Sequence, residues 1–568
     1  MCIVNTRCGA VLGRQRNDVY EFLGVPYAQP PLGDLRFLPA QPVVQWNETI
    51  DCTHHKAIAV QNLNETAVGA DFEPYRSDFY YGGIPSQTEN CLYLDITTSG
   101  FSEKKPVYIW LHGGALTTGY CYEPEFDGTM FAQKGVVLVR ISHRLNVLGC
   151  LALEQLADQS GCSGNYILSD LLCALNWVKQ NISDFGGNPD NITVGGQSGG
   201  TTKALALAIA SRVNGQGIKK LILESGIKWA QAFPSQEEAC QKGRLYLRDL
   251  GLDENISAEE LRALPIDKLM KPSSPYYPGS LVTDNRLLPY DSIRSAIQAG
   301  VLQGTQLIIG CNMGEAPTPS ISTEDELLRF WAENIGCENA KRLRQLTADQ
   351  TPQDAARLMC TYGLCAPEKE NLGRCQGRNL MVARKFSSYL SFLHNDSNVY
   401  VYLFNHFTPN RPEEKGGNRD SSIQWAWHSS ELWYTFGSLA AGIPPARPWS
   451  ETDFQLRDQV NDFWTNFIYT GNPNMGPRVP VCRWESSKAF LEIKEGPICH
   501  TAPLSSDELL EPYVSDLFCS ASDHLLAQLT HIATKTAPPK PLLRSSPSQD
   551  ITGRLMNPSP ERYNLHAK

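Results

Sequence analysis

A turn of five residues, Gly196–Gly200 with the sequence G-Q-S-G-G, constrains the fold of this chain more than any other feature. It follows the β-prone run Ile192–Val194 and precedes the helix-favouring run Lys203–Ala210, so a G-x-S-x-G pattern stands between a strand and a helix. Glycines permit a turn too tight for Cβ atoms, and such a turn pushes Ser198 outward above the first N–H groups of the helix. A chain with 44 glycines also produces this pattern by chance. The rest of the chain decides whether Ser198 is a nucleophile or an ordinary turn residue.

Strand and helix patterns alternate on both sides of this turn. The segment Leu168–Ile182 has apolar residues at a helical period. The alternation predicts an α/β fold with a mostly parallel sheet, and such sheets bind ligands beyond the carboxyl ends of their strands, where Ser198 lies. The segments expected to be strands are 9–13, 19–28, 106–111, 136–141, 220–223, 306–310 and 398–404.

We expect one large domain over residues 1–533, because no internal repeat and no shift in composition marks a linker there. Helix- and loop-rich stretches at about 240–300 and 320–395 are interpreted as cap-like insertions. The Pro- and Ser-rich segment 534–568 is predicted to be a disordered tail.

The composition is that of a well-packed globular protein, with 42% hydrophobic and 19% charged residues. A net charge of −10 disfavours nucleic acids and anionic membrane surfaces as partners. No apolar run reaches the ~18–20 residues that a membrane span needs, and no signal-peptide pattern opens the chain. The 17 cysteines show no metal-ligand spacing, so we expect no metal. Because no signal peptide is visible, we expect reduced thiols and a cytoplasmic location. The sequence does not indicate an oligomeric state.

A serine hydroxyl becomes a useful nucleophile when a base takes its proton and a carboxylate fixes the tautomer of that base. Hydrolytic enzymes with a serine on such a strand–helix turn carry these groups in the chain order Ser, acid, His. His428 lies late in the chain, after Ser198, where this order places the base, but its position alone does not decide whether it is the base. His406 directly follows a predicted core strand and is interpreted as structural. Seven histidines in polar or terminal regions are interpreted as surface residues: His54, His55, His394, His500, His524, His531 and His566.

The loop His112–Leu116, with the sequence H-G-G-A-L, lies at the end of a predicted core strand. It resembles the loops whose backbone N–H groups bind the oxyanion of a tetrahedral intermediate. The alternative is an ordinary glycine turn after a strand. The G-x-S-x-G turn at Ser198 disfavours this alternative, because a serine nucleophile requires an oxyanion hole.

Several further motifs, in the right order, resemble those of the type B carboxylesterases, which include carboxylesterases, cholinesterases and p-nitrobenzyl esterases. The resemblance extends from about residue 8 to about residue 530. It implies an α/β-hydrolase fold, a serine esterase activity and no cofactor. The motifs are Phe22–Ala28 with Leu35–Phe37, Glu89–Asp95 (E-N-C-L-Y-L-D), Phe185–Pro189 and Gly471–Asn474.

The resemblance assigns the acid and the base. The stretch Gly310–Ala316, G-C-N-M-G-E-A, is similar to the one that carries the catalytic glutamate of the family, which makes Glu315 the candidate acid. His428 begins H-S-S-E-L-W-Y, like the H-x-x-E-L-x-Y motif of the family, and becomes the candidate base. Ser225, in E-S-G, matches a serine that supports the acid by hydrogen bonding.

The resemblance also implies that the backbone N–H groups of Gly114, Ala115 and Gly199 form the oxyanion hole. Arg36 and Glu89 match a structural salt bridge of the family.

Three departures from the family pattern bear on chemistry and location. Gln197 and Gly199 stand where many members have Glu and Ala. Cys91 occupies a disulfide position of the family, but the expected partner position holds no cysteine, and Cys52 is the nearest alternative; this agrees with an intracellular protein. The loop 62–90 lacks the tryptophan with which cholinesterases hold a quaternary ammonium, so choline esters are unexpected substrates.

The sequence therefore predicts a serine carboxylic ester hydrolase that uses Ser198, His428 and Glu315 and an acyl-enzyme on a small to medium ester. Acyl transfer, lactone formation and amide cleavage are alternatives with the same triad, because water competes with alcohols and amines at one acyl-enzyme. A non-catalytic adhesion or scaffold protein is a further alternative, and the filled triad positions disfavour it.

Overall fold

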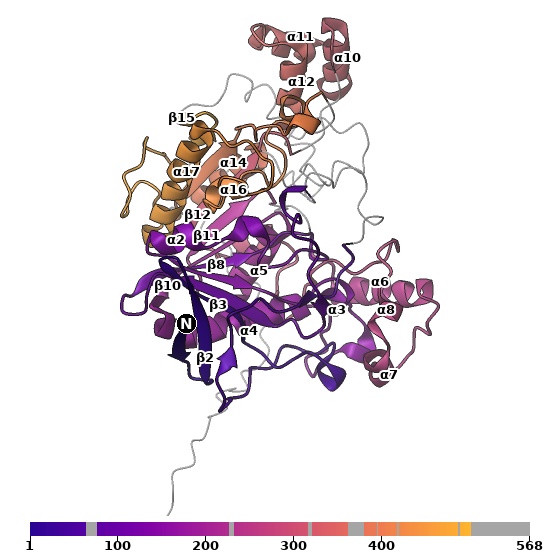
Figure 1. The fold of residues 1–568 in the computed structure, drawn as a ribbon. Coiled ribbons are helices and arrows are strands. Elements are labelled where there is room, and N and C mark those ends of the chain that lie inside the picture. The colour runs from indigo at the N-terminus through magenta and orange to yellow at the C-terminus, as the bar shows by residue number, and fades with distance from the viewer. Residues whose placement is uncertain are drawn as a thin grey trace, which may run out of the picture.

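A 13-stranded sheet forms the centre of the computed structural model, in the order β1-β2-β3-β7-β9-β8-β10-β11-β12-β13-β14-β15, with β4 beside β2 (Figure 1). Neighbouring strands from β9 to β14 run parallel, and antiparallel pairs lie toward both ends of the sheet. The described residues are 1–63, 77–226, 232–315, 321–361, 380–394, 396–416, 420–486 and 489–500. The predicted α/β fold with a mostly parallel sheet is confirmed.

The strands of this sheet are β1 Cys2–Asn5, β2 Ala10–Arg16, β3 Val19–Pro26, β4 Ile50–Asp51, β7 Tyr93–Thr98, β8 Lys105–Leu111, β9 Val137–Ile141, β10 Gly187–Gln197, β11 Lys220–Glu224, β12 Gln306–Asn312, β13 Val399–Phe404, β14 Phe490–Ile493 and β15 Pro497–His500. A separate pair consists of β5 Ile58–Ala59 and β6 Gln87–Thr88. The helices are α2 Thr129–Gln133, α3 Asn146–Cys150, α4 Tyr166–Asn181, α5 Gly199–Val213, α6 Gln236–Asp249, α7 Ala258–Ala263, α8 Ile266–Leu269, α9 Ile293–Gln298, α10 Glu324–Ile335, α11 Cys337–Leu346, α12 Pro352–Thr361, α14 Leu380–Leu393, α15 Ser421–Gln424, α16 Leu432–Thr435 and α17 Glu451–Thr470.

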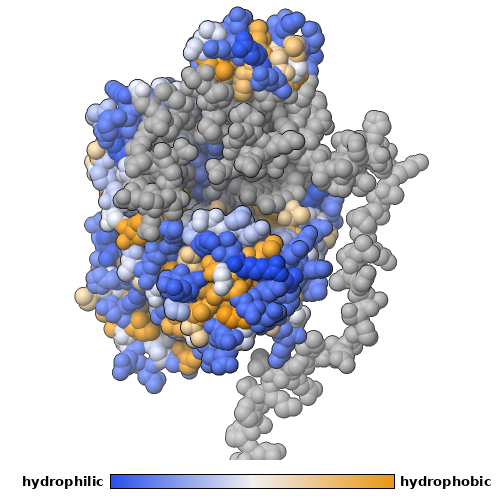
Figure 2. All heavy atoms as spheres, turned by 90° about the vertical axis from the view of Figure 1, so that its right-hand side faces the viewer, coloured by the Kyte–Doolittle hydropathy of each residue, from blue (hydrophilic) through white to orange (hydrophobic). Residues whose placement is uncertain are grey.

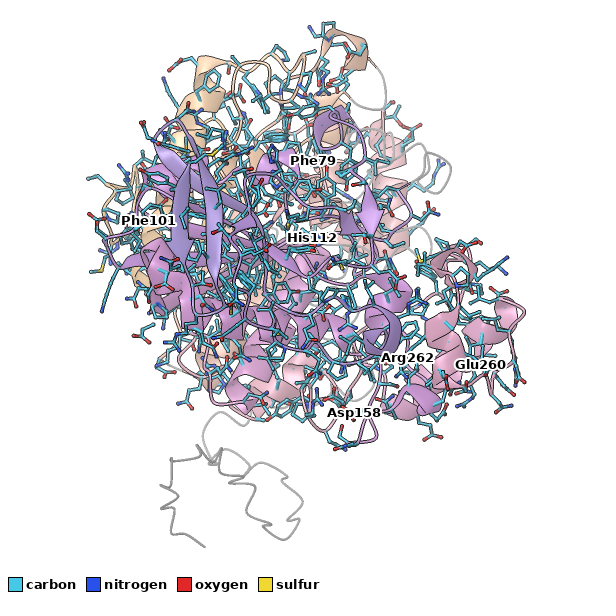
Figure 3. The ribbon with its side chains drawn as sticks, turned by 60° about the horizontal axis from the view of Figure 1, so that its bottom comes forward. Phe79, Phe101, His112, Asp158, Glu260 and Arg262 are labelled. Atoms are coloured by element: carbon cyan, nitrogen blue, oxygen red, sulfur yellow. The ribbon has the colours of Figure 1, made fainter. Side chains whose placement is uncertain are left out.

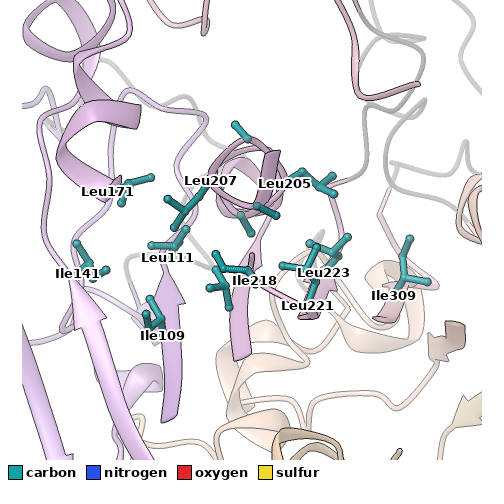
Figure 4. Close-up of a cluster of buried hydrophobic side chains, with 14 of the residues drawn as sticks. Ile109, Leu111, Ile141, Leu171, Leu205, Leu207, Ile218, Leu221, Leu223 and Ile309 are labelled. Atoms are coloured by element: carbon teal, nitrogen blue, oxygen red, sulfur yellow. The ribbon is translucent and has the colours of Figure 1, made fainter. Parts of the chain in front are cut away.

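Helices cover both faces of the sheet, which explains why its central strands are apolar without interruption. In β8, Ile109 and Leu111 enter the cluster under α4 and α5, whereas Tyr108 and Trp110 enter the cluster under α2 and α17. Figure 4 shows part of the first cluster, where side chains of α5 pack over β8, β11 and β12. The two hydrophobic clusters, one on each face of the sheet, fix the positions of the parallel strands and of the loops at their carboxyl ends.

In the described parts of the stretches interpreted as insertions, the regular elements are helices. In Figure 1, α10, α11 and α12 protrude at the top and α6, α7 and α8 lie at the right. Figure 2 shows that right-hand face, where hydrophobic residues lie among hydrophilic ones. The helices α6, α7, α10 and α17 each begin at a hydroxyl that accepts a hydrogen bond from a backbone N–H in the first turn; these caps are Ser235, Ser257, Thr323 and Ser450. The predicted tail, 534–568, lies outside the described residues.

One histidine prediction is wrong. His394 is 7% exposed, and its Nε2 lies 3.0 Å from the carbonyl oxygen of Ile297, because the end of α14 packs against α9. His54 and His55 are exposed, as predicted. Of the other predicted surface histidines, the side chain of His500 and the whole of His524, His531 and His566 lie outside the described part.

The predicted structural roles of two other groups agree with the contacts. His406 Nε2 lies 2.8 Å from Oδ1 of Asp453 in the first turn of α17. Arg36 donates through Nε to Glu89 over 2.7 Å and also binds two backbone carbonyls.

Cys52 and Cys91 are both buried and free. No helix in the described ranges is both long enough and apolar enough to cross a membrane.

A buried ion cluster joins the segment that begins at residue 77 to the loops before α17. Asp78 binds both Arg411 and Arg447, and Glu414 binds the same two guanidinium groups. All four side chains are buried. The cluster fixes the backbone that carries Phe79 next to Asp78.

Replacing Asp78 by alanine is expected to lower the free energy of unfolding by about 3–5 kcal/mol, because two buried guanidinium groups are left with one carboxylate. The urea midpoint measures this loss. The matched control is Glu338→Ala, which removes the exposed partner of Lys341 and is expected to leave the midpoint unchanged. Equal midpoints for wild type and Asp78→Ala would contradict the importance of the cluster.

Candidate active site

Ser198 occupies the sharp turn between β10 and α5, where the sequence predicted it. Its φ of 54° and ψ of −121° are unfavourable for a residue with a side chain, so the surrounding contacts must hold them. The Ser198 N–H donates to the carbonyl of Glu224 over 2.8 Å, and the Thr201 N–H donates to the carbonyl of Ser198 over 3.0 Å. A Cβ at Gly196 or Gly200 would collide with backbone atoms, which explains why both positions are glycine.

Glu315 and His428 meet although they are far apart in the sequence. Glu315 follows the carboxyl end of β12, and His428 lies in the loop between α15 and α16. Nδ1 of His428 is 2.5 Å from Oε2 of Glu315, and the other carboxylate oxygen accepts the Asn312 N–H over 3.0 Å. A hydrogen bond between the N–H of Gly314 and the carbonyl of Ala426 ties the two loops together. This arrangement favours the tautomer with a proton on Nδ1 and a lone pair on Nε2 of His428.

The amide nitrogen of Gln197 lies 3.2 Å from Nε2 of His428 and donates to Oγ of Ser429 over 2.8 Å. The sequence indicated position 197 only as a departure from the family pattern. The structure adds that this side chain contacts the imidazole.

The backbone groups predicted to bind the oxyanion lie beside one another. A Cβ at Gly199 would stand 2.7 Å from the backbone nitrogen of Ala115, so the start of α5 touches the loop after β8. Gly114 and Ala115 have φ values of 86° and 52°, which turn this loop sharply at the site. A Cβ at Gly113 would be 3.5 Å from Cβ of Ser198, so the same loop also approaches the serine.

These groups surround a cavity of about 280 Å³. Four of the predicted site residues line it: Ser198, His428, Gly114 and Ala115. Glu315 is not a lining residue, but its carboxylate contacts the imidazole of His428, which lines the cavity. Figure 3 shows Phe79, another lining residue, and His112 toward the interior, whereas Asp158, Glu260 and Arg262 lie at the periphery. The cavity is therefore the place where the candidate nucleophile and base can reach one substrate.

Ser225 differs from the prediction. Its hydroxyl donates to Oε1 of Glu431 over 3.2 Å, not to Glu315. Asn312 binds the other oxygen of Glu431 through its side chain and binds Glu315 through its backbone. Glu431 belongs to the H-x-x-E motif, and its buried carboxyl receives the hydrogen bond that was expected at Glu315. Ser225 is thus linked to the candidate acid through Glu431 and Asn312.

Two further carboxyl groups lie behind the candidate acid, and sequence reasoning assigned them no role. Burial, together with the nearby Glu224 and Glu315, raises the pKa of Glu431 well above its ordinary value. Burial raises the pKa of Glu224 to about 8, although Trp464 donates to this carboxyl over 2.8 Å. Protonated carboxyls at these positions avoid three adjacent negative charges.

Replacing Glu224 by glutamine is expected to change how stability depends on pH. The carboxyl titrates at about pH 8 in the fold and near pH 4.5 when unfolded, so between these values the fold binds more protons. Its contribution to stability is complete below about pH 4.5 and is lost as the pH rises through 8. The stability of wild type relative to Glu224→Gln should therefore fall between pH 5 and 8, by up to about 1.4 kcal/mol per pH unit. Urea unfolding across this range measures the difference, and parallel curves would contradict the raised pKa.

The chain is similar in sequence and in structure to known esterases. The model of the carboxylesterase family matches residues 2–502. The para-nitrobenzyl esterase of Bacillus subtilis is 28% identical over 493 residues, covering 83% of this chain and 90% of that protein. The fumonisin B1 esterase of Sphingopyxis macrogoltabida is 38% identical, covering 85% and 84%. The carboxylesterase EST55 of Geobacillus stearothermophilus superposes with a TM-score of 0.67 at 25% identity, over 90% of this chain and 100% of its own.

The extent of these matches establishes the α/β-hydrolase fold and an enzyme of the carboxylic ester hydrolase type. The chain belongs to the carboxylesterase family.

Proposed function

We propose that this chain hydrolyses a small to medium carboxylic ester through Ser198, His428 and Glu315. The observation that carries the proposal is the 2.5 Å contact between His428 Nδ1 and Glu315, on an imidazole that lines the same cavity as Ser198. A serine, an imidazole and a carboxylate arranged in this way can perform nucleophilic acyl transfer.

In the first half of the reaction, Oγ of Ser198 attacks the ester carbonyl while Nε2 of His428 takes the hydroxyl proton. Glu315 stabilises the resulting imidazolium through Nδ1. The backbone N–H groups of Gly114, Ala115 and Gly199 bind the oxyanion of the tetrahedral intermediate. When this intermediate collapses, the imidazolium gives its proton to the leaving alkoxide, and an acyl-enzyme remains.

In the second half, water attacks the acyl carbonyl and gives a proton to Nε2 of His428. The intermediate collapses, the proton returns to Oγ of Ser198, and the carboxylic acid leaves. No step in this sequence requires a metal or an organic cofactor.

A fluorophosphonate probe with intact-mass measurement tests the proposal. We expect one covalent adduct on wild type, located at Ser198 by peptide mapping, and no adduct on Ser198→Ala. An unlabelled wild-type chain would favour a non-catalytic scaffold. With an alcohol added to a turnover assay, the carboxylic acid should remain the main product, whereas accumulation of the exchanged ester would favour acyl transfer.

We also propose a cytoplasmic location and cap-like roles for the helices between residues 236 and 298 and between 324 and 393. The thirteen cysteines with described side chains are free thiols, which supports a reducing compartment. Cell fractionation tests the location, and deletion of α10–α12 tests whether these helices alter substrate range without abolishing turnover.

A further inference from the structure

Gln197, the last residue of β10, lies between the elements that carry the other candidate groups of the site. Its strand is flanked by β8 and β11 in the sheet. The side chain lines the cavity, and the residue is only 3% exposed. No step of the proposed reaction uses it. Because a buried amide directs its donors and its acceptor at particular neighbours, the contacts of this side chain indicate what it does.

The amide nitrogen of Gln197 lies against the face of the His428 ring. It is 3.2 Å from Nε2 and 3.5 Å from Nδ1 of the imidazole. A hydrogen bond in the ring plane to one of these nitrogens would leave the other much farther away, so the similar distances place the amide over the ring. The amide therefore restricts tilting of the imidazole and does not occupy the in-plane direction from which Nε2 accepts a proton.

The same amide supports a strained residue beside the base. It donates to Oγ of Ser429 over 2.8 Å, and Ser429 directly follows His428. Ser429 has a φ of 78°, a left-handed conformation that is unfavourable for a residue with a side chain. Contacts with the surroundings must hold this conformation, and the hydrogen bond from Gln197 supplies one of them.

The carbonyl end of the amide touches the loop that carries the candidate oxyanion hole. A Cβ at Gly113 would stand 3.0 Å from Oε1 of Gln197. Gly113 directly precedes Gly114 and Ala115, whose N–H groups are candidates for binding the oxyanion. One neutral side chain thus contacts both the loop of the base and the oxyanion loop.

Acidic groups already surround the imidazole of the base. Glu315 contacts its Nδ1 at 2.5 Å, and Glu431 lies behind this acid, bound to the side chain of Asn312. Glu123 and Glu125 line the same cavity. A negative charge close to the ring favours the imidazolium, which cannot accept the serine proton. A neutral amide holds the ring without adding such a charge.

We propose that Gln197 is a positioning residue of the triad, whose amide holds the ring of His428 and the backbone after it while keeping negative charge away from Nε2. This inference rests on the proposed function and identifies a residue that acts through the base. Substitutions can separate its two properties. Shape and hydrogen bonding fix the geometry of the base, and neutrality sets the pH at which the imidazole becomes a base.

Gln197→Glu keeps the shape of the side chain and adds a charge. The contact with Ser429 can persist, because a serine hydroxyl can donate to a carboxylate as well as accept from an amide. The acid limb of the kcat/KM profile for p-nitrophenyl acetate should move to higher pH by about one unit, because the carboxylate favours the imidazolium. Gln41→Glu, the control, adds the same charge at an exposed position outside the cavity and should leave the limb in place. An unmoved limb in Gln197→Glu would overturn the inference.

Gln197→Met keeps the length of the side chain and removes the donor. We expect kcat to fall about tenfold and KM to change less than about threefold, because the lost group contacts the base. The acid limb should stay in place, since no charge is added. Ser429→Ala removes the acceptor of the same hydrogen bond, so the double variant should lose no more than the worse single variant. An unchanged kcat in Gln197→Met, or losses that multiply in the double variant, would contradict the shared role.

The two proposals can fail separately. If wild type hydrolyses no ester and reacts with no fluorophosphonate, the proposed function fails. The titration of His428 is then followed by NMR in wild type and Gln197→Glu, with His428→Gln to identify the signal. The midpoint should be about one pH unit higher in Gln197→Glu, and equal midpoints would overturn the role of Gln197. If neither variant of Gln197 folds, Ser429→Ala decides: a severalfold loss of kcat supports the inference, and an unchanged kcat overturns it.

Discussion

Replacing Ser198 by alanine is expected to lower kcat for p-nitrophenyl acetate by about 10⁶-fold, the scale of loss when a triad nucleophile is removed. The variant keeps the cavity and the N–H groups of the candidate oxyanion hole but cannot form an acyl-enzyme. A residual rate above the uncatalysed reaction should remain, because binding and oxyanion stabilisation persist. Steady-state kinetics measure the loss, and near-UV circular dichroism checks the fold.

Ser211→Ala is the matched control for this variant. Ser211 is buried in α5, the helix that begins directly after the nucleophile. Its hydroxyl donates to the carbonyl of Ala208 over 2.9 Å and accepts the N–H of Ile218 over 3.5 Å. Its replacement should change kcat less than threefold. An activity above one per cent of wild type in Ser198→Ala would reject Ser198 as the nucleophile.

Replacing Glu315 by glutamine is expected to lower kcat by about 10⁴-fold, as substitution of the acid by its amide does in a Ser-His-Asp triad. The carboxylate faces Nδ1 of His428 at 2.5 Å and favours a proton on that nitrogen. An amide N–H in its place favours the other tautomer, in which Nε2 carries a proton and cannot accept one from serine. It also removes the charge that stabilises the imidazolium.

The rate of fluorophosphonate labelling gives a second measurement of the Glu315→Gln variant, because it reports activation of the nucleophile without a leaving alcohol. Labelling should slow by a similar factor while the final adduct stays at Ser198. Glu154→Gln serves as the control, since its carboxyl is exposed and does not line the cavity. A fall of less than tenfold in both rates would assign the acid to another residue, and Glu431 would then be the first to test.

The sequence alone determined the features that depend on neighbours along the chain. The uninterrupted apolar runs predicted the parallel strands, since a strand buried on both faces has no polar side to show. The glycines around Ser198 predicted the strained turn, since the close backbone approach at Gly196 and Gly200 leaves no space for a Cβ. The family motifs led to Glu315 and His428 as candidates, but they did not place the two side chains in space.

Only the tertiary structure decided which side chains touch. Gln197 and His428 are 231 residues apart, and Ser225 and Glu431 are 206 apart, yet both pairs make contact. Sequence reasoning therefore assigned the Ser225 hydrogen bond to Glu315 and assigned no role to Gln197. The physical reason is that hydrogen bonds and charge interactions act over a few ångströms in space. The packing of helices on both faces of the sheet sets those distances.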